Sequence, residues 1–110
     1  MNINKFTQKS LQAVQDCEKT AMEYGNQEIE QEHLLYALLT QDDSLILKMM
    51  EKMGLDKNLV VDRVEQAIAK RPKVQGGQPY VGQYLNKALI SAEDEMKQMG
   101  DEYVSVEHLL

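Results

Sequence analysis

The sequence predicts an all-α domain built from two copies of one helical repeat, the second of them truncated. Three observations predict this fold. Apolar residues recur at helical spacing through most of the 110-residue chain. Both prolines fall in one segment, residues 72–80, which also carries two glycines, so the helical pattern is interrupted there. Finally, residues 6–35 reappear at a constant offset of 75 as residues 81–110, which indicates an internal duplication.

The first copy begins with a long helix and a short, buried one. The long helix is predicted from about Lys5 to Tyr24, and Gly25 follows it as the expected C-terminal cap. Its apolar stripe, mostly at steps of three and four residues, comprises Phe6, Ser10, Ala13, Val14, Cys17 and Ala21. The short helix is predicted over roughly Gln31 to Thr40. Because it is apolar on most sides, we expect it to lie in the core.

Two further helices complete the first copy. The third follows Ser44, a favourable N-cap residue, and ends at Gly54. The fourth starts near Asp56 and ends at Arg71, because a residue that precedes proline is kept out of helical geometry. The inward residues of the third helix are predicted to be Leu45, Met49, Met50 and Met53. Those of the fourth are Leu59, Val60, Val64, Ala67 and Ile68. The methionines are interpreted as core residues, with an adaptable binding surface as the alternative.

The helical pattern starts again after the interruption. A fifth helix is predicted from about Gly82 to Met99, with the apolar stripe Val81, Leu85, Ala88, Leu89, Ala92 and Met96. Each of these positions is a stripe residue of the first helix plus 75. Eight pairs at this offset are identical, namely Gln8, Ala13, Glu18, Gly25, Glu32, His33, Leu34 and Leu35 with their mates. The shared pattern G-x3-[IV]-x2-EHLL is the strongest sign of the duplication.

The chain is predicted to form a single domain of 12.6 kDa. We place repeat one at about residues 5–71, a linker at 72–80 and a partial repeat two at 81–110. The first copy continues for about 35 residues beyond its EHLL, whereas the second reaches Leu110 within it. We therefore expect residues 1–110 to be a fragment in which the second four-helix repeat is truncated.

Charge and hydropathy argue against several classes of function. With 18 acidic and 12 basic residues the net charge is −6, which disfavours nucleic acid as a partner because phosphate binding needs clustered cations. The longest apolar run, Leu34 to Leu39, is too short to cross a bilayer. The N-terminus has no signal-peptide pattern. The only cysteine, Cys17, is predicted to be a small core residue. These features predict a cytoplasmic protein without a membrane partner.

The paired Glu-His dipeptides are the residues that most suggest an active site. Glu32-His33 and Glu107-His108 each lack a second histidine one turn further on, which a zinc-protease helix requires. We interpret each glutamate as a favourable charge in a first helical turn and each histidine as partly buried, with a metal role as the alternative. No phosphate-binding G-x-x-x-x-G-K-[ST] loop occurs. The chain is thus predicted to be a binding domain and not an enzyme.

Four segments carry a family resemblance. They are KFT at residues 5–7, YGNQEIEQEHLLYALL at 24–39, RPKVQGGQ at 71–78 and MGDEYVSVEHLL at 99–110. Taken in this order, they cover essentially the whole chain. The sequence resembles the N-terminal domain of the Clp chaperone ATPases, and most closely that of the ClpB-type disaggregases.

The resemblance implies a fold and a function. The fold is a pseudo-twofold pair of four-helix repeats, tethered to a homohexameric ATPase ring. In ClpB-type proteins this domain engages unfolded or aggregated polypeptide, which the ring then threads. ATP and Mg²⁺ are implied only for the ring modules, so this chain is expected to hold no cofactor and, in isolation, to be a monomer.

The resemblance also implies a binding site. Substrate contacts in ClpB-type domains correspond to Thr7, Asp101 and Glu107 in this sequence. Glu32 is the repeat mate of Glu107, and in ClpC-type relatives this pair contacts phosphoarginine. Carboxylates beside an apolar groove would favour extended segments that mix basic and hydrophobic residues. The alternative role for these residues is simply to cap the starts of helices.

Two alternative functions remain open from the sequence. The first is a ClpC- or ClpA-type domain that binds adaptor proteins for a protease-associated unfoldase. The second is a stand-alone helical structural protein in which the EHLL segments pair between two chains.

Overall fold

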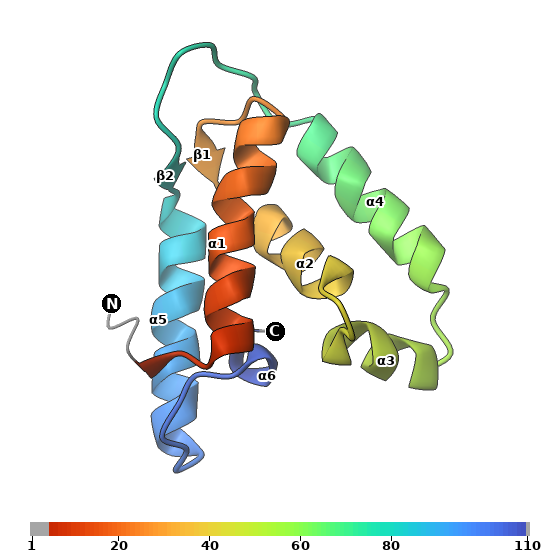
Figure 1. Cartoon of the computed structure of the whole chain (residues 1–110), viewed down its shortest axis with the longest axis vertical. Coiled ribbons are helices and arrows are strands. Elements are labelled where there is room, and N and C mark those ends of the chain that lie inside the picture. The colour runs from red at the N-terminus through yellow and green to blue at the C-terminus, as the bar shows by residue number, and fades with distance from the viewer. Residues whose placement is uncertain (1–4, 110) are drawn as a thin grey trace.

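The all-α prediction is confirmed by the computed structural model, which describes residues 5–109. The elements, in chain order, are α1 (Gln8–Glu23), β1 (Glu28–Ile29), α2 (Gln31–Thr40), α3 (Leu45–Lys52), α4 (Lys57–Ala69), β2 (Tyr80–Val81), α5 (Gln83–Gln98) and α6 (Val106–Leu109). Helix α2 packs against α1, α4 and α5, while α3 and α4 form an arm on the side away from α5 (Figure 1). None of the helices in this described part of the chain has the length and hydrophobicity needed to span a bilayer.

Local capping sets the limits of the helices. Helix α2 has the predicted bounds, and the predicted caps Ser44 and Asp56 accept hydrogen bonds from backbone amides of the first turns of α3 and α4. The prediction for the first helix was wrong at its start, since α1 begins at Gln8. The hydroxyl of Thr7 accepts a hydrogen bond from the amide of Ser10 and thereby starts the helix there.

The other helix ends are close to the predictions. Helix α4 stops at Ala69, two residues before the predicted end at Arg71, and α5 runs from Gln83 to Gln98. The glycines predicted as C-terminal caps all have positive φ angles, which a glycine adopts without strain. They are Gly25, Gly54 and Gly100.

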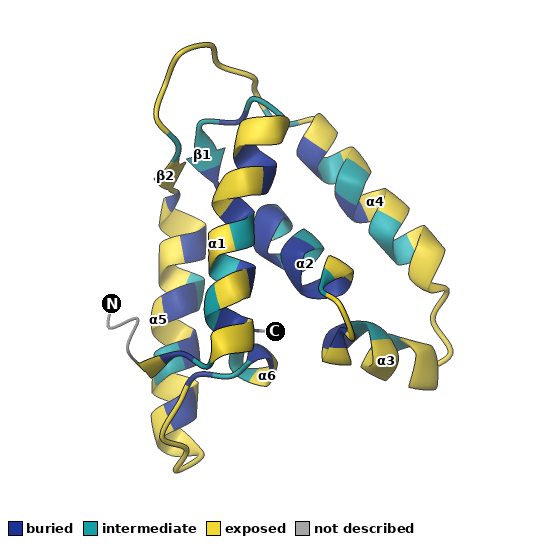
Figure 2. Cartoon of the chain, viewed as in Figure 1, coloured by how far each residue is buried: buried dark blue, intermediate teal, exposed yellow. Residues whose placement is uncertain are grey.

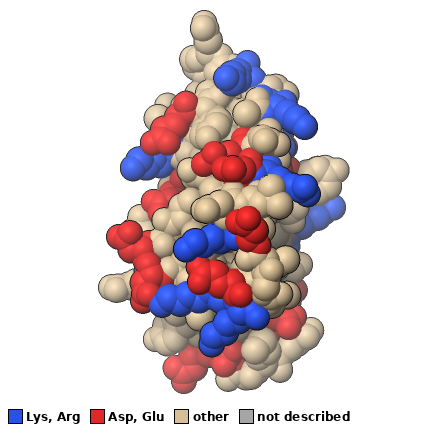
Figure 3. Space-filling model, turned by 90° about the vertical axis from the view of Figure 1, so that its right-hand side faces the viewer, with Lys and Arg blue, Asp and Glu red and all other residues tan. Residues whose placement is uncertain are grey.

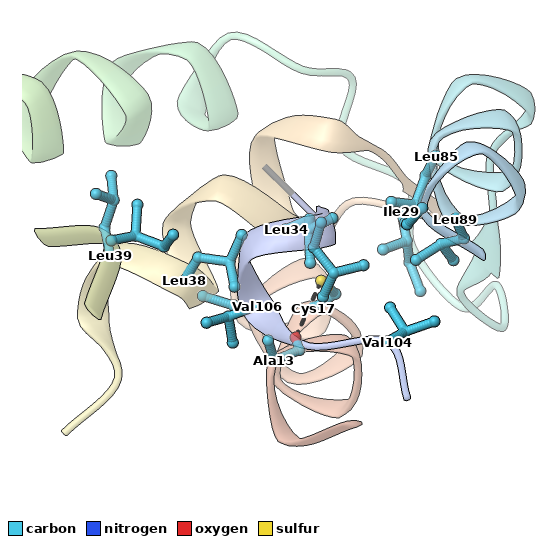
Figure 4. Close-up of a cluster of buried hydrophobic side chains, with 14 of the residues drawn as sticks. Ala13, Cys17, Ile29, Leu34, Leu38, Leu39, Leu85, Leu89, Val104 and Val106 are labelled. Carbon is cyan, nitrogen blue, oxygen red and sulfur yellow. Dashed lines mark hydrogen bonds between the residues drawn. The ribbon is translucent and has the colours of Figure 1, made fainter. Parts of the chain in front are cut away.

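The hydrophobic core is centred on α2 and is shared by both copies. Ala13 and Cys17 of α1 pack beneath Leu34, while Leu85 and Leu89 of α5 meet Ile29 (Figure 4). The stripe predicted for the first helix is buried except for the half-buried Val14. Figure 2 shows that α2 is buried along most of its length.

The arm formed by α3 and α4 differs from the prediction. Met49 and Met53 are exposed, Met53 by 73%, and the buried residue of α3 is Ile46. In α4, Leu59 is also exposed, whereas Val64 and Ile68 are buried as predicted. Met50 is half-buried against the core, and α3 is exposed over much of its surface (Figure 2), so apolar spacing placed Met49 and Met53 on the wrong side.

Two short pairings of extended chain, absent from the sequence prediction, connect the copies. Ile29 of β1 pairs in parallel with Val81 of β2, and Phe6 forms a parallel bridge with Val104. These pairs are each other's mates at the offset of 75. In each copy, the segment before the first helix therefore pairs with the segment that precedes the second helix of the other copy. This pairing sets where α2 and α6 begin.

Candidate functional site

The acidic residues predicted as a site lie at the starts of α2 and α6. Glu32 is in the first turn of α2 and Glu107 in the first turn of α6. The parallel pairings just described end at Ile29 and Val104, in each case two residues before the helix begins. A carboxylate in the first turn is stabilised by the helix dipole, so both glutamates suit their positions.

A histidine clamp fixes each of these helix starts. The amide of Glu30 donates to Nδ1 of His33 at 2.9 Å, so the ring proton is on Nε2, which lies 3.0 Å from Oδ1 of Asn26. The second copy repeats this arrangement at the offset of 75. The amide of Ser105 donates to Nδ1 of His108 at 2.9 Å, and Nε2 donates to Oδ2 of Asp101 at 2.9 Å.

The environment of His33 keeps its ring neutral. The side chain is fully buried, and its burial lowers the pKa of the imidazole, an effect that the positive charge of Arg71 reinforces. The neutral ring both accepts and donates a hydrogen bond, as the clamp requires. The sequence interpretation of the histidines as buried structural residues therefore agrees with the geometry.

The starts of the two long helices are capped in different ways. In α1 the cap is the side chain of Thr7, whose mate in α5 is Gly82. At the start of α5, the carboxylate of the buried Glu30 accepts a hydrogen bond from the amide of Leu85 at 2.9 Å. A Cβ atom at Gly82 would lie 2.4 Å from Cδ of Glu30, so the glycine makes room for a cap supplied by the other copy.

Two hollows adjoin the start of α6. We call the smaller, of about 450 Å³, the α6 cleft; its lining residues are Thr7, Gln8, Lys9, Gln41, Asp43, Leu45, Ser105, Val106 and Glu107. The larger, of about 740 Å³, is the central groove; it is lined by Gln31, Glu32, Leu34, Leu35, Leu38, Ala88, Ser91, Ala92, Glu95, Glu107, His108 and Leu109. Glu107 belongs to both.

The charged groups of the α6 cleft are mostly engaged. The ammonium of Lys9 donates to the backbone carbonyl of Asp42. The carboxylate of Asp43 is paired with Lys48, whose hydrogen bond and charge lower the pKa of Asp43. Glu107 accepts a hydrogen bond from the hydroxyl of Ser105 at 2.6 Å, and within residues 5–109 it has no ion-pair partner.

The structure brings together two of the four candidate site residues, since Thr7 and Glu107 line the α6 cleft. Asp101 lines neither hollow and is linked to α6 by its hydrogen bond with His108. Glu32 lines the central groove, but its carboxylate is occupied by Arg71, whose Nη1 lies 2.6 Å from Oε2. Glu32 therefore differs in state from its repeat mate.

Sequence reasoning missed Arg71 as the partner of Glu32. It also missed that Asn26 and Asp101 accept the histidine hydrogen bonds at the two clamps. A single arginine before a proline belongs to no pattern, so no sequence signal identified its partner. The clamp acceptors could have been found, because Asn26 and Asp101 each follow a repeated glycine at the offset of 75.

Among the residues that the structure describes, no three metal-ligating side chains come together in a cluster. Burial raises the pKa of Cys17 to about 12, and its thiol donates to the carbonyl of Ala13 (Figure 4), so it is an inert core residue as predicted. On the α3–α4 side the two signs of charge are interspersed (Figure 3), unlike the basic surface of a nucleic-acid-binding protein.

Comparison with known proteins identifies the family to which this fold belongs. The profile of the Clp repeat (R) N-terminal domain matches residues 5–110. The chain belongs to this family. The structural neighbours of this Clp repeat domain agree, since the N-terminal domain of the ClpV1 ATPase from E. coli EAEC superposes with a TM-score of 0.89 at 20% identity, covering 97% of this chain and 66% of that one.

The curated relatives of this Clp repeat domain are ClpB chaperones. The chaperone protein ClpB of Nitratidesulfovibrio vulgaris is 40% identical over 114 residues, and that of Porphyromonas gingivalis is 42% identical over 110 residues. These matches cover 99% and 100% of this chain. The chain spans only 13% of the length of either relative.

Proposed function

We propose that this Clp repeat domain is the client-binding N-terminal domain of a ClpB-type disaggregase. In this proposal it captures unfolded or aggregated polypeptide, and modules outside residues 1–110 supply the ATP- and Mg²⁺-dependent motor. The observation that carries the proposal is the α6 cleft, where apolar side chains lie beside the unpaired carboxylate of Glu107. The domain itself performs binding and no catalysis.

The shape of the cleft supports an extended ligand. Leu45 and Val106 give it an apolar surface, and Thr7 and Glu107 give it polar groups. A second carboxylate, Asp101, lies outside the lining of the cleft, is exposed and uses one oxygen to hold His108 of α6. An unfolded segment with a hydrophobic residue next to a basic one matches this combination. Ordering such a segment costs conformational entropy, so weak and promiscuous binding is expected.

The test measures the affinity of a fluorescently labelled, permanently unfolded polypeptide for the full chain and for two variants. Glu107→Gln removes a charge from the cleft, and Asp101→Asn removes one while it keeps an acceptor for His108, as Asn26 does in the first copy. Part-exposed ion pairs contribute about 0.5–1 kcal/mol, so each variant should bind about two- to fivefold more weakly.

Glu102→Gln is the matched control. It makes the same change in charge one residue from Asp101, on an exposed side chain that, unlike Asp101, makes no hydrogen bond to α6 among the described residues. Its affinity should equal that of the unaltered chain. Equal affinities for Glu107→Gln and Asp101→Asn, in folded protein, would show that the α6 cleft is not the binding site.

A further inference from the structure

The acidic helix starts of the two copies differ in what surrounds them. We propose that the side chain of Arg71 occupies the helix start at Glu32 and thereby prevents cationic residues of a client from binding there. This inference rests on the proposed client-binding function and specifies which part of the surface performs it. It makes Arg71 a specificity-determining residue, although Arg71 itself contacts no client.

The guanidinium of Arg71 is placed between two carboxylates. Its Nη1 lies 2.6 Å from Oε2 of Glu32, and its Nη2 lies 3.9 Å from Oε2 of Glu28. The Arg71 side chain is only 22% exposed, and that of Glu32 33%. Within residues 5–109 the buried Nε of Arg71 has no hydrogen-bond partner, so the two carboxylates are what hold the guanidinium. A client cation would have to displace it.

The backbone around Arg71 is fixed to the same helix start. Nδ2 of Asn26 donates to the carbonyl of Pro72 at 3.1 Å, and the amide of Val74 donates to the carbonyl of Gly25 at 2.8 Å. The segment that follows α4 is thereby attached to the turn that precedes α2. An arginine held by such contacts acts at a high effective concentration compared with a residue on a separate chain.

The start of α6 has the opposite character. The mate of Asn26 is Asp101. The side chain of Asp101 has no N–H to donate, so it cannot make the hydrogen bond that the Asn26 side chain makes to the carbonyl of Pro72. Glu107, the mate of Glu32, forms no ion pair among residues 5–109, since Lys9 of the same cleft donates to the carbonyl of Asp42. The first copy thus shows, within the molecule, how a guanidinium binds beside Glu32 and Glu28. The mates of these two residues are Glu107 and Tyr103, so the second copy presents one carboxylate at the matching position. Arginine suits a carboxylate because its planar fork can donate two parallel hydrogen bonds to it.

The experiment uses isotope-labelled full chain and a capped pentapeptide of leucine and alanine with a central arginine. Amide chemical shifts locate the bound peptide, and calorimetry counts the sites. The unaltered chain should bind one peptide, with shifts at Asp101 and Glu107 and none at Glu32. Arg71→Gln should open a second site, with new shifts at Glu32 and His33. The same peptide with citrulline in place of arginine should bind at neither position, because it has the shape but not the charge.

Controls separate occupancy from folding. The double variant Glu32→Gln/Arg71→Gln, which removes the Glu32 carboxylate together with its occupant, should return to one site. If Arg71→Gln does not fold, Glu32→Gln replaces it and should bind the peptide within twofold of the unaltered chain. A second site in the unaltered chain, no new site in folded Arg71→Gln, or a larger loss in Glu32→Gln would overturn the role of Arg71.

One outcome distinguishes this inference from the proposed function. If the unaltered chain binds no peptide and Arg71→Gln binds one at Glu32, the α6 cleft is not a client site, yet Arg71 is confirmed as the occupant of the first helix start.

Discussion

The two helix starts of the repeats have the same clamp but different surroundings. At α2, His33 and Asn26 are buried, and Glu32 is neutralised by Arg71. At α6, His108 makes the same two hydrogen bonds, but Asp101 is exposed and Glu107 lines both hollows. The duplicated residues thus determine the backbone geometry, and the residues that differ determine whether the position is closed or open.

The largest difference is expected in the packing of the long helices. Ala13 is fully buried against α2, whereas its mate Ala88 lines the central groove. Ala13→Leu should lower the free energy of unfolding by about 1–3 kcal/mol, because the core has no room for the added atoms. Ala88→Leu should change it by less than about 0.5 kcal/mol, since the groove accommodates the side chain. Urea unfolding measures both, and equal losses would mean that the two faces are packed alike.

The clamp acceptors give the next largest difference. Asn26→Asp removes the donor to the carbonyl of Pro72 and leaves a carboxylate in its place, so the free energy of unfolding should fall by about 1–2 kcal/mol. The reverse change, Asp101→Asn, should cost less than about 0.5 kcal/mol because the exposed side chain keeps its acceptor. Thermal unfolding of both variants compares them. A stable Asn26→Asp chain would contradict the role given to the Pro72 contact.

The caps give a smaller difference that can be reversed. Gly82→Thr should destabilise the chain by about 1 kcal/mol, because the new side chain displaces Glu30 from the amide of Leu85. Adding Glu30→Ser should recover most of this loss, since the new hydroxyl can then cap α5 as Thr7 caps α1. Chemical denaturation of the single and double variants provides the measurement. If the double variant is the less stable of the two, the two capping modes are not interchangeable.

The pH dependence of the first clamp gives the most gradual effect. The pKa of His33 lies below 6.5, so the unfolded chain takes up its proton first as the pH falls. The contribution of His33 to stability should be complete above pH 6.5 and decrease as the pH falls below that value. Arg71→Gln should raise the pKa of His33 because it removes a nearby positive charge. NMR titration of the imidazole measures this pKa. An unchanged His33 pKa in Arg71→Gln would mean that Arg71 does not lie near the ring.

Most helices could be predicted from the sequence because their signals are local. The bounds of α2 and the caps Ser44 and Asp56 follow from hydropathy and capping preferences. The side of α3 that is buried could not be predicted. Met49 and Met53 fit an apolar stripe, but which stripe is covered depends on neighbours contributed by distant parts of the chain.

The candidate site, too, was predictable from the sequence only in part. The offset of 75 identified Glu32 and Glu107 as mates, and the resemblance added Thr7 and Asp101. Their roles in binding stay predictions. The placement of Thr7 beside Glu107 required residues 100 positions apart to meet through the bridge of Phe6 with Val104.

By itself, the sequence determined the duplication and the helical class, because these depend on the spacing of residues along the chain. Only the tertiary structure decided that the two acidic starts are unequal. Arg71 reaches Glu32 across 39 residues, and Glu30 caps a helix 55 residues away. Such pairings depend on how the helices pack, which a repeat pattern does not specify. Within residues 5–109, Glu107 is left as the cleft carboxylate without an ion-pair partner, since Asp43 is paired with Lys48.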